Sequence, residues 1–242
     1  MSILPEGLVD HPACTSVAAY LGRLAPYTTW PSVAELDALF ADRLRLPDAV
    51  ALESQPPGKK ARGRDAIYEV RIHETRRIPT RPDSWHDLMN LLVWCAYPRS
   101  KRALSARQHA NVTRQVPSDA TKLPARRTRE GDALAMLDEG GALLLVRPSS
   151  AHLALDRPDH VAREIREGHA TLRLFGHALL EAVALGQLTE QRDLRSAVTV
   201  LHAEDDDAAD TQLAARLSDP GAFQSPDAAQ TLWLGPLLAA RA

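Results

Sequence analysis

Histidine, aspartate and asparagine interrupt an otherwise apolar segment between residues 84 and 97 of this 242-residue chain. On a helix His86 and Asn90 share one face, whereas Asp87 points about 100° away from His86. A histidine held by a hydrogen-bonding neighbour is the usual general base in enzymes, because its pKa lies near neutrality. We therefore predict His86, Asp87 and Asn90 as the catalytic candidates of a hydrolytic site, whose remaining partner comes from another segment.

Basic residues surround this segment and favour an anionic ligand. Residues 59–129 hold 17 Lys and Arg against 6 Asp and Glu, although the whole chain has a net charge of −2. Guanidinium groups bind phosphate and carboxylate through two hydrogen bonds at once, so a phosphate-bearing small molecule is the leading hypothesis. A solvated basic face is the alternative interpretation. The predicted ligand-binding residues are Arg81, Trp85, Arg99, Lys101, Arg129, Asp132 and His177.

A metal site is a second form of chemistry for the same segment. It would use His86 and His177 together with Asp87, Glu181 or His109, but a zinc motif such as His-Glu-x-x-His is absent from the sequence. We therefore predict no metal ligands, and the sequence specifies no cofactor. Neither a Gly-x-Ser-x-Gly nucleophile motif nor a phosphate-binding glycine loop occurs.

Two further functions compete with a small-molecule site. Trp85, Trp94 and Tyr97 beside the basic block offer stacking and charge, which is how proteins bind RNA or single-stranded DNA. A structural or regulatory protein whose buried polar groups merely satisfy one another is the third interpretation. The sequence leaves open whether the protein is an enzyme.

The elements that position these residues follow from local patterns. Pro79 and Pro82 stiffen the approach to the apolar segment, and Ser84-x-x-Asp87 predicts a capping box that starts a helix ending before Pro98. Alternating apolar residues predict a strand over 67–72, paired in a hairpin with 50–53, and 99–124 is predicted as loop. A second hairpin is predicted from 133–137 and 142–146, with the latter strand central and buried on both faces.

The C-terminal half is predicted to supply the partner of the central helix. Helices are expected over 160–167 and 169–185, a strand over 195–202 and a helix over 208–217. Gly176, inside the second helix, would let another helix approach closely and bring His177 and Glu181 to His86. We predict one α+β domain spanning 1–242, in which a small, mainly antiparallel sheet of hairpins packs against several α-helices.

Composition excludes several classes of protein. With 45% hydrophobic and 25% charged residues the chain is globular, and no apolar run reaches the roughly 18 residues that cross a bilayer. The N-terminal residues show no basic segment followed by an apolar stretch, so we expect no secretory leader. Only Cys14 and Cys95 are present, and they suit a reducing compartment. We predict a cytoplasmic protein with no membrane contact and no disulfide-linked partner.

Several of these motifs occur together in a known family. The chain resembles the bacterial domain of unknown function 3025 family through Tyr68-Glu-x-Arg-Ile, Pro79-Thr-Arg, Trp85-His-Asp-Leu-x-Asn, Asp138-Glu and Gly176-His-Ala-Leu-Leu-Glu. The resemblance covers about residues 66–182. It implies that these segments form one recurring set, as a composite site requires, and it implies no particular reaction.

Overall fold

The computed structural model describes residues 2–46, 49–55, 64, 67–120, 124, 126–150, 158–187 and 195–239. Its helices and strands in chain order are η1 (Pro12–Cys14), α1 (Ala18–Leu24), α2 (Val33–Leu39), α3 (Ala41–Leu44), β1 (Ala51–Ser54), α4 (Tyr68–Thr75), β2 (Arg77–Thr80), α5 (Trp85–Ala96), α6 (Pro98–Thr113), α7 (Arg129–Gly140), β3 (Gly141–Val146), η3 (Pro148–Ser150), α8 (Pro158–Arg166), β4 (Ala170–Leu174), α9 (His177–Ala184), β5 (Arg195–Leu201), α10 (Asp206–Ser218), η4 (Pro226–Ala228), β6 (Gln230–Trp233) and α11 (Leu234–Ala239). The predicted α+β class is confirmed.

A four-stranded sheet in the order β4-β3-β5-β6 forms one part of the core. Strand β3 pairs antiparallel with β4 and parallel with β5, and β5 pairs antiparallel with β6. Every residue of β3 is buried, which confirms the prediction of a central strand over 142–146. The sheet is therefore mixed, with two antiparallel pairs and one parallel pair.

Neither predicted hairpin forms. Residues 68–75 are helix α4, and the short strand β1 pairs in parallel with β2, with Leu52 opposite Ile78. Residues 129–140, predicted to hold a strand and a turn, are helix α7, which runs directly into β3. Parallel strands need a crossover connection, and α4 lies in the connection between β1 and β2.

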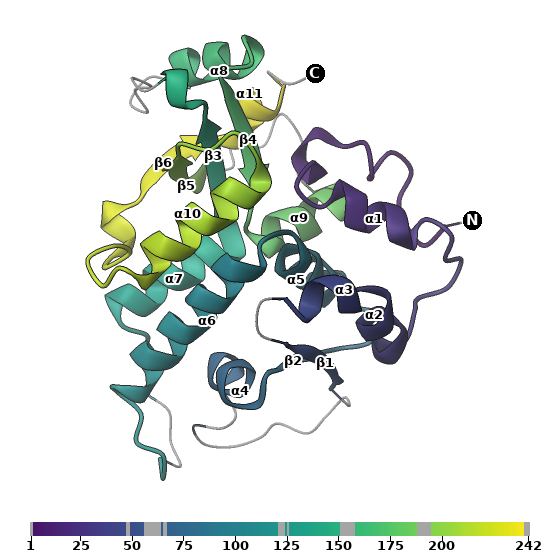
Figure 1. Ribbon diagram of the computed structural model, residues 1–242, viewed down its shortest axis with the longest axis vertical. Coiled ribbons are helices and arrows are strands. Elements are labelled where there is room, and N and C mark those ends of the chain that lie inside the picture. Colours follow the sequence, from purple (N-terminus) through teal and green to yellow (C-terminus); the bar gives the residue numbers. More distant parts are fainter. Residues whose placement is uncertain are drawn as a thin grey trace.

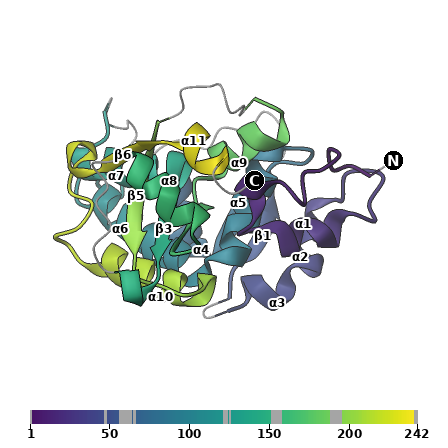
Figure 2. The same ribbon diagram turned by 90° about the horizontal axis from the view of Figure 1, so that it is seen from above.

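Helices α5 and α9 lie between two groups of elements. Figures 1 and 2 show α1 to α3 at one end of the molecule and the four-stranded sheet at the other, with α5 and α9 in the middle. Helix α5 contributes Leu88, Met89, Leu92 and Val93 to the core, each at most 2% exposed. The predicted helix is thus the central element of the fold, and its polar residues lie where the two groups meet.

The ends of α5 follow from single residues. The Ser84 hydroxyl accepts a hydrogen bond from the Asp87 N–H at 3.3 Å and starts the helix as predicted. The second half of the predicted capping box does not form, because the Asp87 carboxylate accepts hydrogen bonds from Arg81. Pro98 ends α5 and at once begins α6, since proline is favoured at the first helical position. The loop predicted over 99–124 is therefore wrong for residues up to Thr113.

The region predicted as one helix over 169–185 is instead strand β4 followed by α9. Gly176 stands just before α9, and a Cβ there would lie 2.5 Å from the Gly141 nitrogen. The predicted close approach is correct, but the neighbour is the junction of α7 with β3. Helix α8, strand β5 and helix α10 confirm the remaining predictions for this half.

The two cysteines are free and buried, as expected for a chain without a disulfide. Burial raises the pKa of Cys14 to about 12, so this thiol stays protonated at neutral pH. In the described part of the chain, no helix combines the length and the apolar character that crossing a bilayer requires.

Candidate functional site

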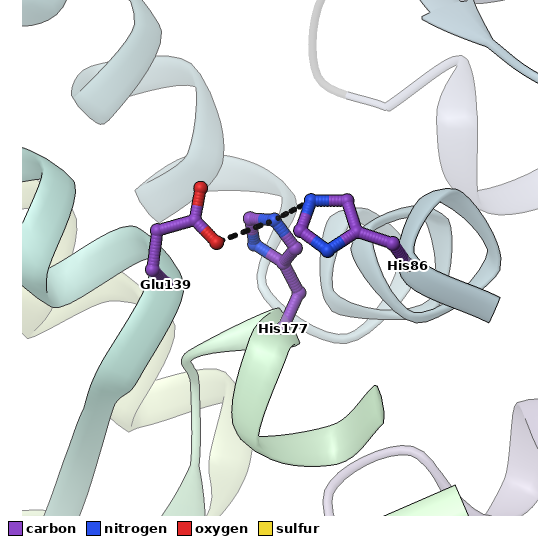
Figure 3. A group of neighbouring side chains, drawn as sticks. All are labelled: His86, Glu139 and His177. Atoms are coloured by element: carbon purple, nitrogen blue, oxygen red, sulfur yellow. Dashed lines mark hydrogen bonds and ion pairs between the residues drawn. The ribbon is translucent and has the colours of Figure 1, made fainter. Parts of the chain in front are cut away.

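Two histidines from different helices face each other beside a carboxylate (Figure 3). His86 lies in the first turn of α5 and His177 is the first residue of α9, and their Nε2 atoms are 3.0 Å apart. Glu139, near the end of α7, places Oε2 3.4 Å from His177 Nε2. Three helices thus bring two imidazole nitrogens and one carboxylate oxygen to one point, and these three residues form a candidate metal-binding group.

The Nδ1 atom of each imidazole faces a carboxylate other than Glu139. His86 Nδ1 is 2.9 Å from Glu181 Oε2, and His177 Nδ1 is 3.7 Å from Asp138 Oδ1. The His177 side chain is 4% exposed, and its Nδ1 makes no hydrogen bond within normal limits. Both rings therefore turn Nδ1 towards a carboxylate and Nε2 towards each other.

A buried ion pair supports this arrangement. Lys101 on α6 reaches Asp138 and also donates to Asn90 Oδ1 at 2.9 Å, and the Lys101 side chain is 4% exposed. Burial alone would raise the pKa of Asp138, but Lys101 and His177 outweigh that effect and hold the pKa well below its ordinary value. Asp138 is therefore ionised at neutral pH, and its charge favours an Nδ1–H on His177.

The group opens into a pocket of about 430 Å³. Four carboxylate side chains line the pocket, against two guanidinium groups, those of Arg81 and Arg127. The Arg81 side chain donates to the Asp87 carboxylate at 2.8 and 2.9 Å, so much of its charge is already matched. The lining is Gln55, Ile67, Tyr68, Glu69, Pro79, Arg81, His86, Asp87, Asn90, Gln108, Arg127, Ala135, Asp138, Glu139 and His177.

Five of the predicted site residues line this pocket. They include His86 of α5 and His177 of α9. As expected from the Gly176 segment, both His177 and Glu181 lie beside His86. The five also include Asn90, one helical turn beyond His86, which contacts Lys101 and Tyr68. The five residues are His86, Asn90, His177, Arg81 and Asp87.

The other predicted residues do not line the pocket. Trp85 packs edge-on against Trp30 with ring centroids 5.1 Å apart. Arg99 donates to Asp207 at 2.7 Å, and Arg129 pairs with Asp227.

Two more predicted residues are also outside the lining. Lys101 lies behind the pocket in its ion pair with Asp138, and Asp132 is exposed on the first turn of α7. His109, considered as a metal ligand, stacks on His73 with ring centroids 4.2 Å apart. The predicted cations are therefore dispersed over the molecule and paired with carboxylates of the same chain.

Sequence reasoning assigned no role to Asp138, Glu139 or Tyr68. All three lie in segments whose predicted secondary structure is wrong: helix α7 includes Asp138 and Glu139 in place of the predicted hairpin turn, and helix α4 begins at Tyr68 in place of the predicted strand. A signal was present, since Tyr68 and the Asp138-Glu139 pair belong to the motifs that carried the family resemblance. Glu181 was predicted to lie near His86, with a possible role as a metal ligand, and the structure places it 2.9 Å from His86 Nδ1.

Comparison with known proteins gives a family and no activity. A family model described as protein of unknown function (DUF3025) matches residues 57–238, which is well over half of the chain. The protein belongs to this family, and the match extends beyond residues 66–182, where the motifs lie. A search of curated proteins found no match, and a search of solved structures found none either.

Proposed function

We propose that this protein is a metal-dependent hydrolase whose divalent ion is held by His86, His177 and Glu139. The observation that carries the proposal is the spacing of the three facing atoms, 3.0 Å between the two Nε2 atoms and 3.4 Å from His177 Nε2 to Glu139 Oε2. Tetrahedral zinc with bonds of about 2.0 to 2.1 Å places its ligand atoms roughly 3.3 Å apart. The three side chains need little movement to hold such an ion.

The protonation of the two imidazoles supports a cation between them. Glu181 and Asp138 favour N–H at the Nδ1 atoms of His86 and His177, which leaves an unshared electron pair on each Nε2. Two such pairs 3.0 Å apart repel each other unless a proton or a metal ion lies between them. A carboxylate behind a metal-binding histidine is also the usual outer arrangement of zinc sites.

The charge of the pocket favours the same conclusion. Four carboxylates against two guanidinium groups make the lining attractive to a cation and unattractive to a free anion. An anionic substrate, expected from the basic sequence, would therefore bind through the metal and through Arg127, for which no ion pair is found among the described residues. In this proposal His86 acts as a ligand and not as the general base predicted from the sequence.

Two histidines and one glutamate leave a coordination position open for water or substrate. The ion would supply Lewis acidity and lower the pKa of bound water to about 7, which suits hydrolysis at neutral pH. The protein orients the ligands through Glu181 and Asp138 and admits a small substrate to the 430 Å³ pocket. We propose a small anionic ester or amide as the substrate class.

Metal content tests the proposal. We expect the dialysed protein to retain about one Zn²⁺ or Co²⁺ per chain, and His86→Ala, His177→Ala and Glu139→Gln each to lower the metal affinity by tenfold or more. His109→Ala is the matched control, because His109 lies outside the pocket and should leave metal binding unchanged. Equal metal content in the wild type and in the His86→Ala and His177→Ala variants would exclude the site.

Activity is tested separately on the metal-loaded protein. A panel of chromogenic phosphate and carboxylate esters should show turnover that is lost after chelation and restored by Zn²⁺. Turnover that is equal in the His177→Ala variant would contradict a role for this metal in the reaction.

A further inference from the structure

A chain of hydrogen bonds beside the histidines fixes the orientation of Asn90. A lysine ammonium group donates hydrogen bonds and accepts none, so the Asn90 atom 2.9 Å from Lys101 Nζ must be the amide oxygen. The amide nitrogen then faces the Tyr68 hydroxyl at 2.6 Å and donates to it. Lys101 thereby fixes the orientation of the Asn90 amide.

This orientation leaves the Tyr68 hydroxyl proton available. The hydroxyl oxygen accepts from Asn90, so its own O–H points elsewhere, and no acceptor for it is found among the described residues. Tyr68 lines the same pocket as His86 and His177. Burial raises the pKa of Tyr68 well above its ordinary value, so the hydroxyl is protonated at neutral pH. The pocket therefore contains a hydroxyl donor that has no acceptor within the part of the chain that the structure describes.

The donor lies close to the proposed metal. Asn90 is four residues beyond His86 on α5, so the two side chains are neighbours on one face, with Cβ atoms roughly 5 to 6 Å apart. A small oxyanion that contacts an ion held by His86 is thus within reach of the hydroxyl bonded to Asn90.

We propose that Tyr68 is a further catalytic residue, which donates a hydrogen bond to the substrate oxygen that becomes negatively charged during hydrolysis. The inference rests on the metal site proposed above and adds its substrate-binding partner. When water adds to the carbonyl carbon and gives up a proton to solvent, the C–O π electrons move to the carbonyl oxygen, and the Tyr68 O–H stabilises the resulting charge without giving up its own proton. The electron pair then returns to re-form the carbonyl, the bond to the leaving oxygen or nitrogen breaks, and the leaving group takes up a proton from solvent. Lys101 and Asn90 are positioning residues for this hydroxyl.

Inorganic phosphate bound to the Co²⁺-loaded protein is a direct probe of this donor. We expect Tyr68→Phe to weaken phosphate binding roughly tenfold, because a hydrogen bond to a charged group is lost, and to leave Co²⁺ affinity unchanged. The unfolding temperature should fall, because the buried Asn90 amide loses its acceptor. Imidazole is the comparison probe, since once bound to the metal it has no acceptor for Tyr68, and its affinity should not change. Tyr27→Phe, in the N-terminal segment, is the matched control for the substitution.

The outcomes separate this inference from the proposed function. Failure of the wild type to bind Co²⁺ would overturn the metal site and the role of Tyr68 with it. Normal Co²⁺ binding with equal phosphate affinity in the wild type and Tyr68→Phe would overturn the role of Tyr68 alone. A Tyr68→Phe protein that binds imidazole more weakly as well would also contradict it, because a general change in the metal site would then explain the loss.

Discussion

Glu130 connects the two helices that carry Lys101 and Asp138. It lies in the first turn of α7 and accepts hydrogen bonds from Arg107 Nε at 2.9 Å and Asn111 Nδ2 at 2.8 Å, both on α6. Burial alone raises the pKa of Glu130, but these hydrogen bonds and the nearby arginine charges outweigh it and lower the pKa below its ordinary value. The ionised carboxylate therefore stabilises the packing of α6 against α7.

Substitution of Glu130 should reveal this contribution and its pH dependence. We expect Glu130→Gln to lower the free energy of unfolding at pH 7 by about 1 to 3 kcal/mol, because hydrogen bonds from charged donors are weakened. The pKa is lower in the folded than in the unfolded protein, so the stabilisation is present above the unfolded value near 4.3 and is lost as pH falls below it. Urea unfolding of wild type and variant at several pH values measures the difference.

Glu6→Gln is the control for that experiment, because Glu6 is exposed and the substitution should change stability by less than about 0.5 kcal/mol. A difference between wild type and Glu130→Gln that is the same at pH 7 and pH 3 would contradict the assignment.

At the scale of elements, the junction of α7 with β3 sets the position of α9. Gly141 O accepts hydrogen bonds from Phe175 N at 3.0 Å and Gly176 N at 2.7 Å. A Cβ on Gly176 would lie 2.6 Å from Glu139 O and from Gly140 N. This contact places His177, the next residue, beside Glu139 and Asp138.

Adding a methyl group at Gly176 should move the start of α9 away from the junction of α7 with β3. We expect Gly176→Ala to lower the free energy of unfolding by about 1 to 3 kcal/mol through overpacking, and to weaken Zn²⁺ binding because His177 moves away from Glu139. Gly22→Ala is the matched control, since nothing lies within 4 Å of its Cβ position in α1, and it should stabilise the protein slightly. Thermal unfolding with and without Zn²⁺ measures both effects, and equal behaviour of the two variants would be evidence against this contact.

The same elements explain what the sequence predicts and where it fails. The central helix was predictable because Ser84, Pro98 and a long apolar run mark its ends and interior. Helix α4 was mistaken for a strand because Tyr68, Val70 and Ile72 alternate with polar residues over only a few positions, where the two periods are hard to tell apart. Contacts with α6 and β2 decide the conformation there, and no local pattern reports them.

Part of the site was also predictable from local sequence patterns. His86 and Asn90 interrupt an apolar segment, and Gly176, which precedes His177, indicated a close approach of another element. Glu139 belongs to a motif of the family but gave no local signal of its role, because a carboxylate near two glycines is typical of an ordinary turn and only the tertiary fold brings it to His177.

At the scale of the whole molecule, several cations of the basic block pair with carboxylates from elsewhere in the described part of the chain, namely Arg71, Arg99, Lys101, Arg107, Arg114 and Arg129. Arg99 pairs with Asp207 of α10, and Arg129 pairs with Asp227 of η4. Arg107 donates to Glu130 and to backbone carbonyls that follow α10. Ion pairs thus connect the basic block to acidic residues of other segments.

We therefore expect generic RNA and single-stranded DNA to give no mobility shift with this protein at about 0.15 M salt, where remaining surface charges are screened. The variant Asp207→Asn with Asp227→Asn is the informative comparison, because both aspartates are exposed and their loss removes one carboxylate partner each from Arg99 and Arg129, although Arg99 keeps Asp210 at 3.5 Å. This variant should bind nucleic acid more tightly than the wild type at low salt, with an affinity that falls as salt increases. A salt-dependent shift of the wild type as strong as that of the variant would show instead that the arginines are free to contact phosphate, and nucleic-acid binding would then be favoured.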